Sequence, residues 1–343
     1  DRQVTIGLPT MREREDILKV HVRNKPVAED VDLHRLAEAT PMFSGADLEN
    51  LTNEAALVAA RTNQQIITWA DFNEALDRIT LGLRRSSLVP TDEERQILAF
   101  HEAGHAVLYA AQPELGEIRK VTISPRGGAG GFMAPLGKEE MFLSVERFRA
   151  QLVVAFGGRV AEKRVTGTLS SGASNDLKQA TEIAKQMVLD LGMGEHEYVA
   201  WGSDQGPIFL GGEISRRKDF SEETARQLEN KVEGILRESY ERATEMVNEH
   251  WHAVEAVATA LLKVETIDGK LIKRAYETAE AGETTEVITQ SIVDAIAEHE
   301  RKVAASAERN KAKAEEAQRR EEAQARPPSA PSNPRPATEG PRG

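Results

Sequence analysis

Apolar residues recur at helical spacing along much of this 343-residue chain, and four amphipathic helices are predicted near its start. They cover residues 11–24, 31–40, 43–64 and 68–79, and Ser44 and Thr68 are the expected N-caps of the last two. Residues 1–10 read as one apolar strand that ends in a proline turn. The pattern therefore predicts a helical block over residues 1–82, followed at 83–92 by a linker that contains two serines and a proline.

The hydrophobic pattern over residues 93–280 predicts a second, mostly helical domain with a small β element. Its helices are expected over 100–112, 144–165, 174–192, 221–249 and 251–263 and from 268 onward, and its strands within the glycine-rich stretch 118–137. A looser stretch runs from 192 to 220. The predicted fold class is thus mainly α, with two helical domains in series.

The character of the chain changes at about residue 281, where it becomes charged and alanine-rich and loses its large apolar residues. Residues 281–343 are therefore predicted to form a solvated helix that ends in a proline-rich, disordered tail. The lack of sustained apolar heptads argues against a coiled coil.

Composition narrows the chemistry. The chain has no cysteine, which excludes disulfides, thiolate nucleophiles and cysteine-bound zinc, so any metal must be held by His, Asp or Glu. The net charge of −12 argues against nucleic acid as a partner. No apolar run reaches the roughly 18 residues of a membrane helix, and no signal peptide opens the chain. Since the chain starts without Met and in what reads as mid-domain sequence, we expect an N-terminal segment to be missing.

The main chemical signal is the helix FHEAGHAVLYAAQ at 100–112. His101 and His105 are four residues apart and lie on one helix face, where two imidazoles can bind one metal ion, and Glu102 can reach a water on that metal. Gly104, inside this helix, costs about 1 kcal/mol relative to alanine, which suggests that another backbone passes close to the metal face. The pattern H-E-x-x-H is short, however, and also arises by chance.

A catalytic zinc needs a third protein ligand, and the residues alone leave two candidates. Asp176 lies at the start of a predicted helix in SSGASNDLKQAT, where the helix N-terminus favours an anion but where acids are also common without any function. Glu162, in FGGRVAE, is the rival. His250 and His252 face apart on a helix and are interpreted as surface or core histidines.

Several segments, in order, resemble the protease domain of the FtsH-type AAA metalloproteases: FHEAGHA, KVTISPRG, FGGRVAE, SGASNDLKQAT and LGMG. Upstream, DRQVTIGLPTMREREDILKVH and TPMFSGADLENLTNEAAL resemble the end of that family's ATPase module and its helical lid. The resemblance covers roughly residues 1–276, so residues 1–82 are expected to be the end of the AAA module with its lid, and 93–280 a zincin-type protease domain.

The resemblance implies roles for the catalytic residues. His101 and His105 would be zinc ligands, Asp176 the third ligand and Glu102 the general base. Glu162 would then orient a ligand imidazole, and the paired glycines 157–158 would permit close helix packing beside the site.

The resemblance also implies two binding surfaces. The strand around 121–124 resembles the sheet edge to which an unfolded substrate adds as a β-strand. In the lid, Gly45 and Ala46 are expected to pack near a nucleotide, and Ile17 and His21 to flank its adenine; the alternative for Ile17 is a core position.

Departures from the family pattern matter as well. The chain contains no G-x-x-x-x-G-K-[ST] phosphate loop, so ATP and Mg²⁺ are expected only with an ATPase core that this sequence lacks. The expected function is that of an ATP-dependent zinc endopeptidase that degrades unfolded or membrane-extracted proteins. The resemblance further implies a homo-hexamer at the cytoplasmic face of the inner membrane, attached through a missing N-terminal segment.

Two other classes stay open at this point. The chain could be a non-proteolytic partner, a lid and degenerate protease body used for assembly or chaperoning, although the intact His101, Glu102, His105 and Asp176 argue against it. It could also be a plain nucleotide-binding module with a chance H-E-x-x-H, against which the missing phosphate loop argues.

Overall fold

The structure is a computed structural model that describes residues 7–84, 90–136, 140, 142–193, 199–201 and 221–325, with side chains described up to residue 305. The protein divides into two compact units, residues 1–297 and 298–343. The strand expected at residues 1–10 falls mostly outside the described residues, as do most of the loose stretch 192–220 and the proline-rich tail.

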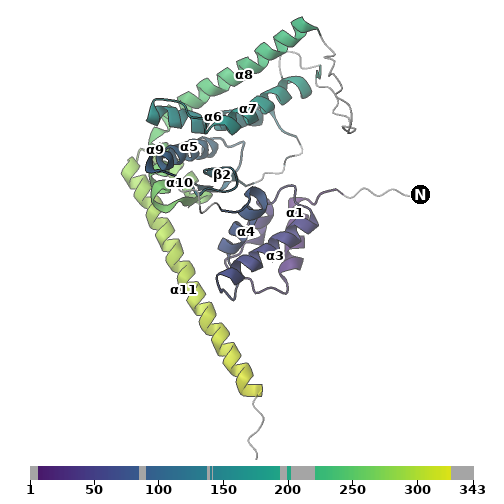
Figure 1. Ribbon diagram of the computed structural model, residues 1–343, viewed down its shortest axis with the longest axis vertical. Helices are drawn as coiled ribbons and strands as arrows, with labels where there is room; N and C mark the ends of the chain where they lie inside the picture. The colour runs from purple at the N-terminus through teal and green to yellow at the C-terminus, as the bar shows by residue number, and fades with distance from the viewer. Residues whose placement is uncertain are drawn as a thin grey trace, which may run out of the picture. The chain divides into compact units, whose positions relative to one another are not determined.

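The first unit begins with the predicted helical block, drawn in purple and blue in Figure 1. Its helices are α1 (Met11–Val22), α2 (Leu33–Glu38), α3 (Gly45–Arg61) and α4 (Trp69–Leu81). All four predicted helices are confirmed, within a few residues at each end. They share one apolar core, whose largest fully buried members are Leu18, Leu36, Leu48, Leu51, Phe72 and Leu76.

Side-chain caps explain why these helices begin where they do. Ser44 accepts a hydrogen bond from the Asp47 backbone N–H, and the Asp47 carboxylate accepts one from the Ser44 backbone N–H at 2.9 Å. This reciprocal arrangement satisfies two N–H groups that a helix start leaves without partners. At the other end of the block, the fully buried Arg14 donates to the carbonyl of Ala37 at 2.7 Å, which ties α1 to the C-terminal end of α2.

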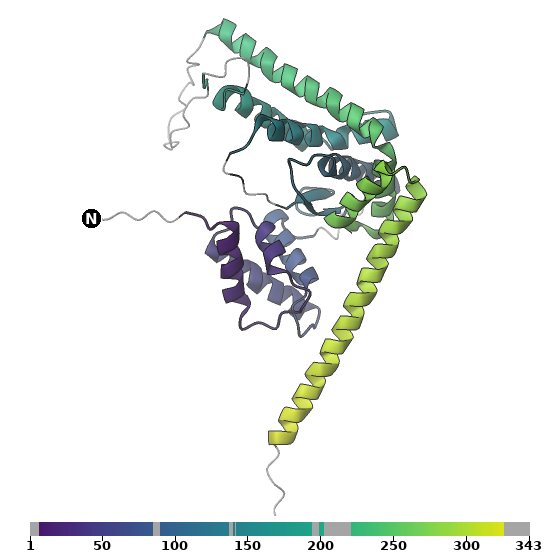
Figure 2. The same ribbon diagram turned by 180° about the vertical axis from the view of Figure 1, so that it is seen from behind.

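The second group of helices is built around α5 (Asp92–Ala110), which is continuously buried from residue 99 to residue 109. Packed on or near it are α6 (Val145–Thr166), α8 (Glu222–Glu249), α9 (Trp251–Val264) and α10 (Gly269–Glu280). Helix α7 (Ser174–Lys185) continues into a π-helical turn, η1 (Gln186–Asp190). Figures 1 and 2 both show α8 running alongside α6 and α7. The helices predicted for this region are confirmed, but α5 begins at Asp92, eight residues before the expected start at residue 100.

A three-stranded antiparallel sheet has the order β2 (Phe132–Pro135), β1 (Ile118–Thr122) and β3 (Thr266–Asp268). The β element predicted in the stretch 118–137 is confirmed. The strand β3 was not predicted, because three residues between two helices give no periodic signal.

The position of β1 corrects one expectation. The strand around 121–124 was expected to be a free edge, but β1 pairs with β2 on one side and with β3 on the other. Its backbone hydrogen-bonding groups are therefore used within the sheet, and a substrate cannot add there. Among the described residues, the strands with an unpaired side are β2 and β3.

Helix α11 (Thr285–Ala325) confirms that the charged C-terminal region is helical as far as residue 325. Its first turns bury Ile288, Thr289 and Ile292 within the first unit. The second unit contains the rest of this helix, from Glu298. Among the described residues, no helix is both long and apolar enough to cross a membrane.

Candidate metal centre

The helix α5 presents both histidines of the H-E-x-x-H motif on one buried face. His101 and His105 are each 8% exposed, and their Nε2 atoms lie 3.1 Å apart. The Glu102 side chain is 5% exposed and belongs to the same buried stretch of helix. The helix can hold these three polar groups because its other faces are apolar and pack into the large core around it.

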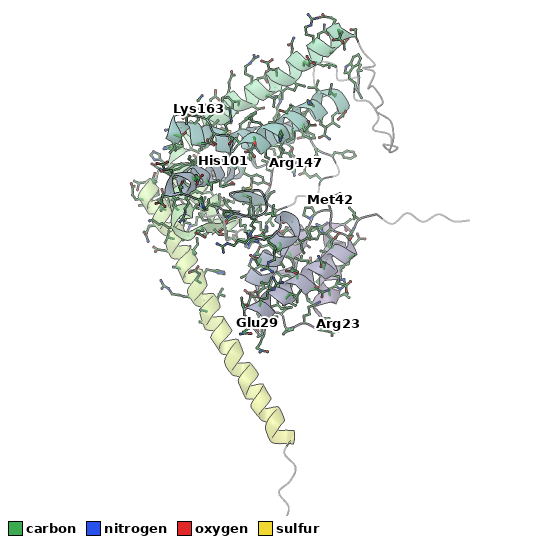
Figure 3. All side chains as sticks on the ribbon, in the orientation of Figure 1. Arg23, Glu29, Met42, His101, Arg147 and Lys163 are labelled. Atoms are coloured by element: carbon green, nitrogen blue, oxygen red, sulfur yellow. The ribbon has the colours of Figure 1, made fainter. Side chains whose placement is uncertain are left out.

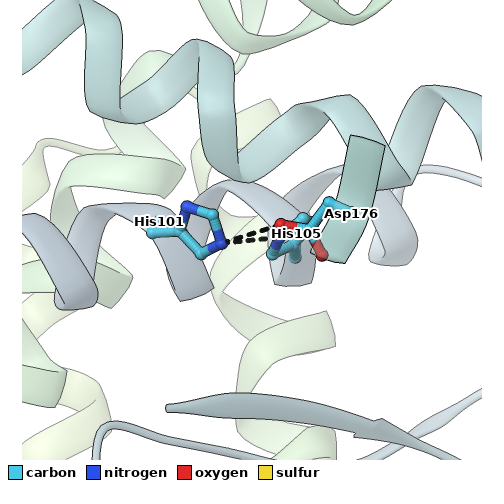
Figure 4. A group of neighbouring side chains, drawn as sticks. All are labelled: His101, His105 and Asp176. Carbon is cyan, nitrogen blue, oxygen red and sulfur yellow. Dashed lines mark hydrogen bonds and ion pairs between the residues drawn. The ribbon is translucent and has the colours of Figure 1, made fainter. Parts of the chain in front are cut away.

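The third member of the cluster comes from α7. Asp176 lies in the first turn of that helix, as predicted, and its Oδ2 is 3.2 Å from His101 Nε2 and 3.6 Å from His105 Nε2. Figure 4 shows the aspartate reaching across to the two imidazoles, with dashed lines for these contacts. The helix N-terminus and the nearby imidazoles both favour the charged carboxylate.

The spacing of the three atoms suits a small metal ion. The atoms that His101, His105 and Asp176 can offer to a metal all lie within 4.8 Å of one another. A tetrahedral zinc site with bonds of about 2.0–2.1 Å places its ligand atoms roughly 3.3–3.4 Å apart. The observed separations of 3.1, 3.2 and 3.6 Å bracket that value. Two imidazole nitrogens and one carboxylate oxygen are also a donor set that zinc prefers.

The outer nitrogens of both imidazoles have partners of their own. His105 Nδ1 lies 2.7 Å from the carbonyl oxygen of Val154 on α6, and since a carbonyl can only accept, Nδ1 carries the proton and Nε2 is left free to bind a metal. His101 Nδ1 lies 3.6 Å from Glu162 Oε2, and Glu162 Oε1 accepts a hydrogen bond from the backbone N–H of Ser170 at 2.8 Å. Glu162 therefore faces the side of His101 away from Asp176. It is placed to orient the imidazole, not to bind the same metal.

The charges around the site shift the acidity of its groups. Burial lowers the pKa of His101, but the carboxylates of Asp176 and Glu162 outweigh this effect and raise the pKa to about 10. Burial alone would raise the pKa of Asp176, whereas its close contacts with the imidazoles of His101 and His105 hold that pKa well below its usual range. Burial raises the pKa of Glu102, and the charges of the two histidines offset part of that rise. At neutral pH, a metal that binds His101 must therefore displace a proton.

Three glycines explain how two helices approach so closely at this site. A Cβ atom at Gly104 would lie 2.4 Å from the carbonyl oxygen of Gly157 on α6, which confirms that another backbone passes close to the metal face. A Cβ at Gly158 would lie 2.5 Å from His105 Nε2. The paired glycines of α6 therefore do permit close packing beside the site, as predicted. Figure 3 shows where His101 lies among these helices.

Some groups around the site left no signal in the sequence. A Cβ at Gly131, the residue before β2, would lie 3.0 Å from Glu102 Oε1, so this stretch of backbone runs directly beside the glutamate. The Val154 carbonyl is likewise a backbone group. Backbone groups have no residue type of their own, and only a glycine such as Gly131 marks a close approach.

The histidines at 250 and 252 behave as interpreted. His250 is buried and lies 3.0 Å from Glu280 Oε1, with its ring against that of Tyr276. His252 is exposed, and its Nδ1 lies 3.3 Å from the Thr285 hydroxyl. Neither belongs to the metal-binding cluster found among the described residues.

The four residues expected near a nucleotide lie on helices α1 and α3 and not in the metal centre. Ile17 is half-buried against the lid core, which supports a packing role, and His21 is half-buried at the end of α1. Gly45 and Ala46 form the first turn of α3, and a Cβ at Gly45 would meet no atom within 4 Å. Nothing within the described residues therefore requires a glycine at position 45.

An H-E-x-x-H helix whose two histidines face a carboxylate as the third ligand is the arrangement of metallopeptidases, and it places this chain in that class of enzymes. Sequence comparison then gives the family, because residues 88–275 match peptidase family M41, and the chain belongs to that family. Residues 30–74 match the AAA+ lid domain.

Curated relatives agree with this assignment. The chain is 44% identical over 272 residues to "ATP-dependent zinc metalloprotease FtsH 2" of Salinibacter ruber, covering 79% of this chain and 40% of that protein. It is 42% identical over 278 residues to "ATP-dependent zinc metalloprotease FtsH" of Acidobacterium capsulatum, covering 81% of this chain and 44% of the relative. The chain thus spans about two-fifths of the length of the relatives it matches.

Proposed function

We propose that this chain is the lid and protease portion of an ATP-dependent zinc endopeptidase that hydrolyses unfolded or membrane-extracted polypeptides. The observation that carries the proposal is the convergence of His101, His105 and Asp176 from two helices, with Glu102 buried beside them. Membership of a peptidase family and the names of the relatives support the same reaction.

Each residue has a distinct role in this proposal. His101, His105 and Asp176 would hold the zinc ion. A zinc ion supplies a Lewis acid and lowers the pKa of a bound water from about 15.7 to about 7. Glu102 would accept the proton of that water and later deliver it to the leaving amine. The raised pKa of Glu102, caused by its burial, suits a group that both takes and returns a proton.

We further propose that the substrate adds to the free side of β2. This strand pairs only with β1 among the described strands, and the backbone just before it runs beside Glu102. An extended peptide on that side would form main-chain hydrogen bonds, which read no particular side chain and so accept many sequences. Met133→Pro removes one backbone N–H from β2. If this N–H binds substrate, kcat/KM for a long peptide should fall more than for a dipeptide amide, and an equal fall for both would argue against β2.

The first test is cleavage of an unstructured peptide by the full chain, with and without a zinc chelator. We expect chelator-sensitive cleavage. We expect Glu102→Gln to retain zinc but to lose about 10²–10⁴-fold in rate, the usual contribution of a general base. Glu93→Gln, an exposed position on the same helix, is the matched control and should cleave at the original rate. Cleavage at an unchanged rate by Glu102→Gln would remove that residue from the proposed role. A zinc-bound chain that cleaves nothing would favour the non-proteolytic alternative.

Nucleotide binding, assembly and membrane attachment are proposals for the whole protein. ATP and Mg²⁺ would be bound by an ATPase core together with the lid, with Ile17 and His21 flanking the adenine and with Gly45 and Ala46 near the nucleotide. The open space at Gly45 and the lid match support this placement. In a fusion with the ATPase segment of the Salinibacter relative, Ala46→Glu should raise the KM for ATP; an unchanged KM would move the nucleotide elsewhere.

The assembly proposed from the family resemblance is a homo-hexamer at the cytoplasmic face of the inner membrane. The same fusion, studied by sedimentation velocity, should give a species of six chains. A monomer at micromolar concentration would contradict this expectation.

A further inference from the structure

A cavity of about 360 Å³ lies between helix α4 and the sheet, and none of the metal-cluster residues lines it. We call it the α4–sheet cavity. Four cationic side chains line it, together with three hydroxyl groups. The cations are Arg84, Arg119, Lys120 and Arg126, and the hydroxyls belong to Thr122, Ser124 and Thr266. Two carboxylates, Glu74 and Asp268, also line the cavity, and each is already paired with an arginine. Its volume falls within the range of about 300–1,000 Å³ that is usual for small-molecule sites.

The carboxylate that neutralises most of these cations lies behind them. Asp77 is fully buried and does not line the cavity. It lies 2.8 Å from Arg119 Nη2 and 3.4 Å from Arg126 Nε, and it also pairs with the ammonium group of Lys120. One carboxylate is thus shared by three cations. Arg119 also donates to Asn73, and Arg126 donates to both carboxylate oxygens of Glu74. The cations with donors left for a second anion are therefore Lys120, whose ammonium has three N–H groups, and the exposed Arg84.

The other carboxylates near the cavity do not balance the positive charge of these cations. Arg126 also pairs with Glu74, but Glu74 is shared with Arg78, whose other partner is Glu54. In this network, four cations, Arg78, Arg119, Lys120 and Arg126, share three carboxylates, Glu54, Glu74 and Asp77. Such a local excess of positive charge stands out in a chain whose net charge is −12.

Arg84 adds a more adjustable cation at the mouth of the cavity. Its Nη2 lies 3.2 Å from the Ser124 hydroxyl and 3.3 Å from Glu265 Oε2, and its side chain is 57% exposed. Glu265 is also shared with Arg95, 3.6 Å away. A long, partly exposed guanidinium with one shared partner can turn toward a bound anion at little cost.

The acidity of Lys120 reflects the same imbalance. Burial, followed by the charge of neighbouring Arg119, lowers the pKa of the Lys120 ammonium to about 8, although Asp77 opposes the change. An additional negative charge in the cavity would favour the protonated amine and move this pKa back toward its usual value.

We propose that the α4–sheet cavity binds a small phosphate-class oxyanion, either free or as the phosphate group of a larger metabolite. Guanidinium groups match phosphate oxygens with paired hydrogen bonds, and the Lys120 ammonium adds a compact positive charge beside them. Because Asn73 and Glu74 come from α4 whereas Lys120 comes from β1, the bound anion bridges the helical block that matches the AAA+ lid and the domain that carries the metal centre.

The proposal is tested with the full chain by isothermal titration with inorganic phosphate and, in a second arm, with pyrophosphate, against potassium chloride at equal ionic strength. We expect saturable binding with a dissociation constant below about 1 mM at low salt. Lys120→Met and Arg84→Gln should each weaken binding by about tenfold or more, the usual contribution of a charged hydrogen bond. Lys19→Met, an exposed lysine of α1 with ion pairs to Glu15 and Asp16, is the matched control.

Each outcome separates a specific site from general attraction. Lys120→Met leaves Asp77 paired with two arginines, and Arg84 is too exposed to be needed for folding, so both variants should remain folded by circular dichroism. The zinc content is measured before and after the titration. An unchanged content rules out loss of zinc to pyrophosphate as the source of the calorimetric heat. In an NMR titration of a chain labelled with carbon-13 at lysine Cε, the Lys120 signal is identified as the one missing from Lys120→Met. Its pKa should be about 8 and should rise when phosphate is added. The proposal is overturned by no saturable binding, by equal affinity in all variants, or by an unmoved Lys120 titration. Binding in the pyrophosphate arm alone assigns the site to larger phosphate compounds.

Discussion

Replacing Gly104 with alanine tests how closely α5 and α6 must approach to form the metal centre. The new Cβ would lie 2.4 Å from the Gly157 carbonyl oxygen and 2.8 Å from Ala161 Cβ, whereas ordinary contact begins at 3.4 Å. The backbone oxygen cannot turn away as a flexible side chain would. The helices must therefore move apart by about 1 Å, or the local backbone must distort.

Two opposing terms set the size of the effect. Overpacking of a core costs about 1–3 kcal/mol, and a contact this short with backbone belongs at the upper end. Alanine in place of glycine returns about 1 kcal/mol of helix propensity. We expect the free energy of unfolding to fall by roughly 2 kcal/mol, which for a domain of this size lowers Tm by about 4–8 °C. His101 and His105 would move with α5, so zinc affinity should fall as well.

The assay is thermal unfolding followed by circular dichroism, combined with zinc affinity from competition with a chelator. Gly234→Ala in α8 is the matched control, since a Cβ there would meet no atom within 4 Å and only the helix propensity changes. We expect that control to be about 0.5–1 kcal/mol more stable than the original chain, with unchanged zinc affinity. The reasoning is refuted if Gly104→Ala raises Tm as Gly234→Ala does.

Three further predictions follow from the same geometry. Asp176→Ala should leave the purified chain with little zinc by metal analysis, because only two ligands remain; full occupancy would make Glu162 the better ligand. Glu162→Gln should keep the zinc site but weaken zinc affinity by about 10–100-fold, the usual effect of losing a group that orients a ligand imidazole, and an unchanged affinity would show that Glu162 does not perform this role. Met42→Gly should stabilise the lid by up to about 1 kcal/mol in a denaturant titration, because Met42, labelled in Figure 3, has a φ of +64° and is 76% exposed. Reduced stability of that variant would mean that the Met42 side chain contributes packing of its own.

The helices could be predicted because their signals are local. Ser44 begins α3 and Thr68 begins α4 where their hydroxyls were expected as caps, and the apolar spacing marks the length of each helix. The charged stretch after residue 281 was likewise predicted to be helical from its composition, and α11 agrees as far as residue 325. The proposed division at residues 83–92 and 280 remains a prediction.

The sheet was harder to predict, since its pairing is not local. The strand β1 meets β3 only after more than 140 intervening residues, and Thr122 pairs with Thr266 in the register. The family resemblance implied that the strand around 121–124 was an edge, and nothing in the local sequence pointed to β3 as its second partner. The metal centre could be predicted in part from local signals, as the helices were, but also depends on non-local contacts, as the sheet does. Two ligands share one helix and were visible at i and i+4, whereas the choice between Asp176 and Glu162 depends on which ring nitrogen of His101 each carboxylate faces.

The burial of α5 determines how stable the metal-binding helix is. Eleven consecutive residues of this helix, from 99 to 109, are buried against apolar side chains from the helices around it. The zinc helix is therefore held by hydrophobic packing, and its backbone amides should be among the last in the protein to exchange with deuterium. We therefore expect the chain to stay folded when a chelator removes the metal, and to regain zinc when the ion is added back.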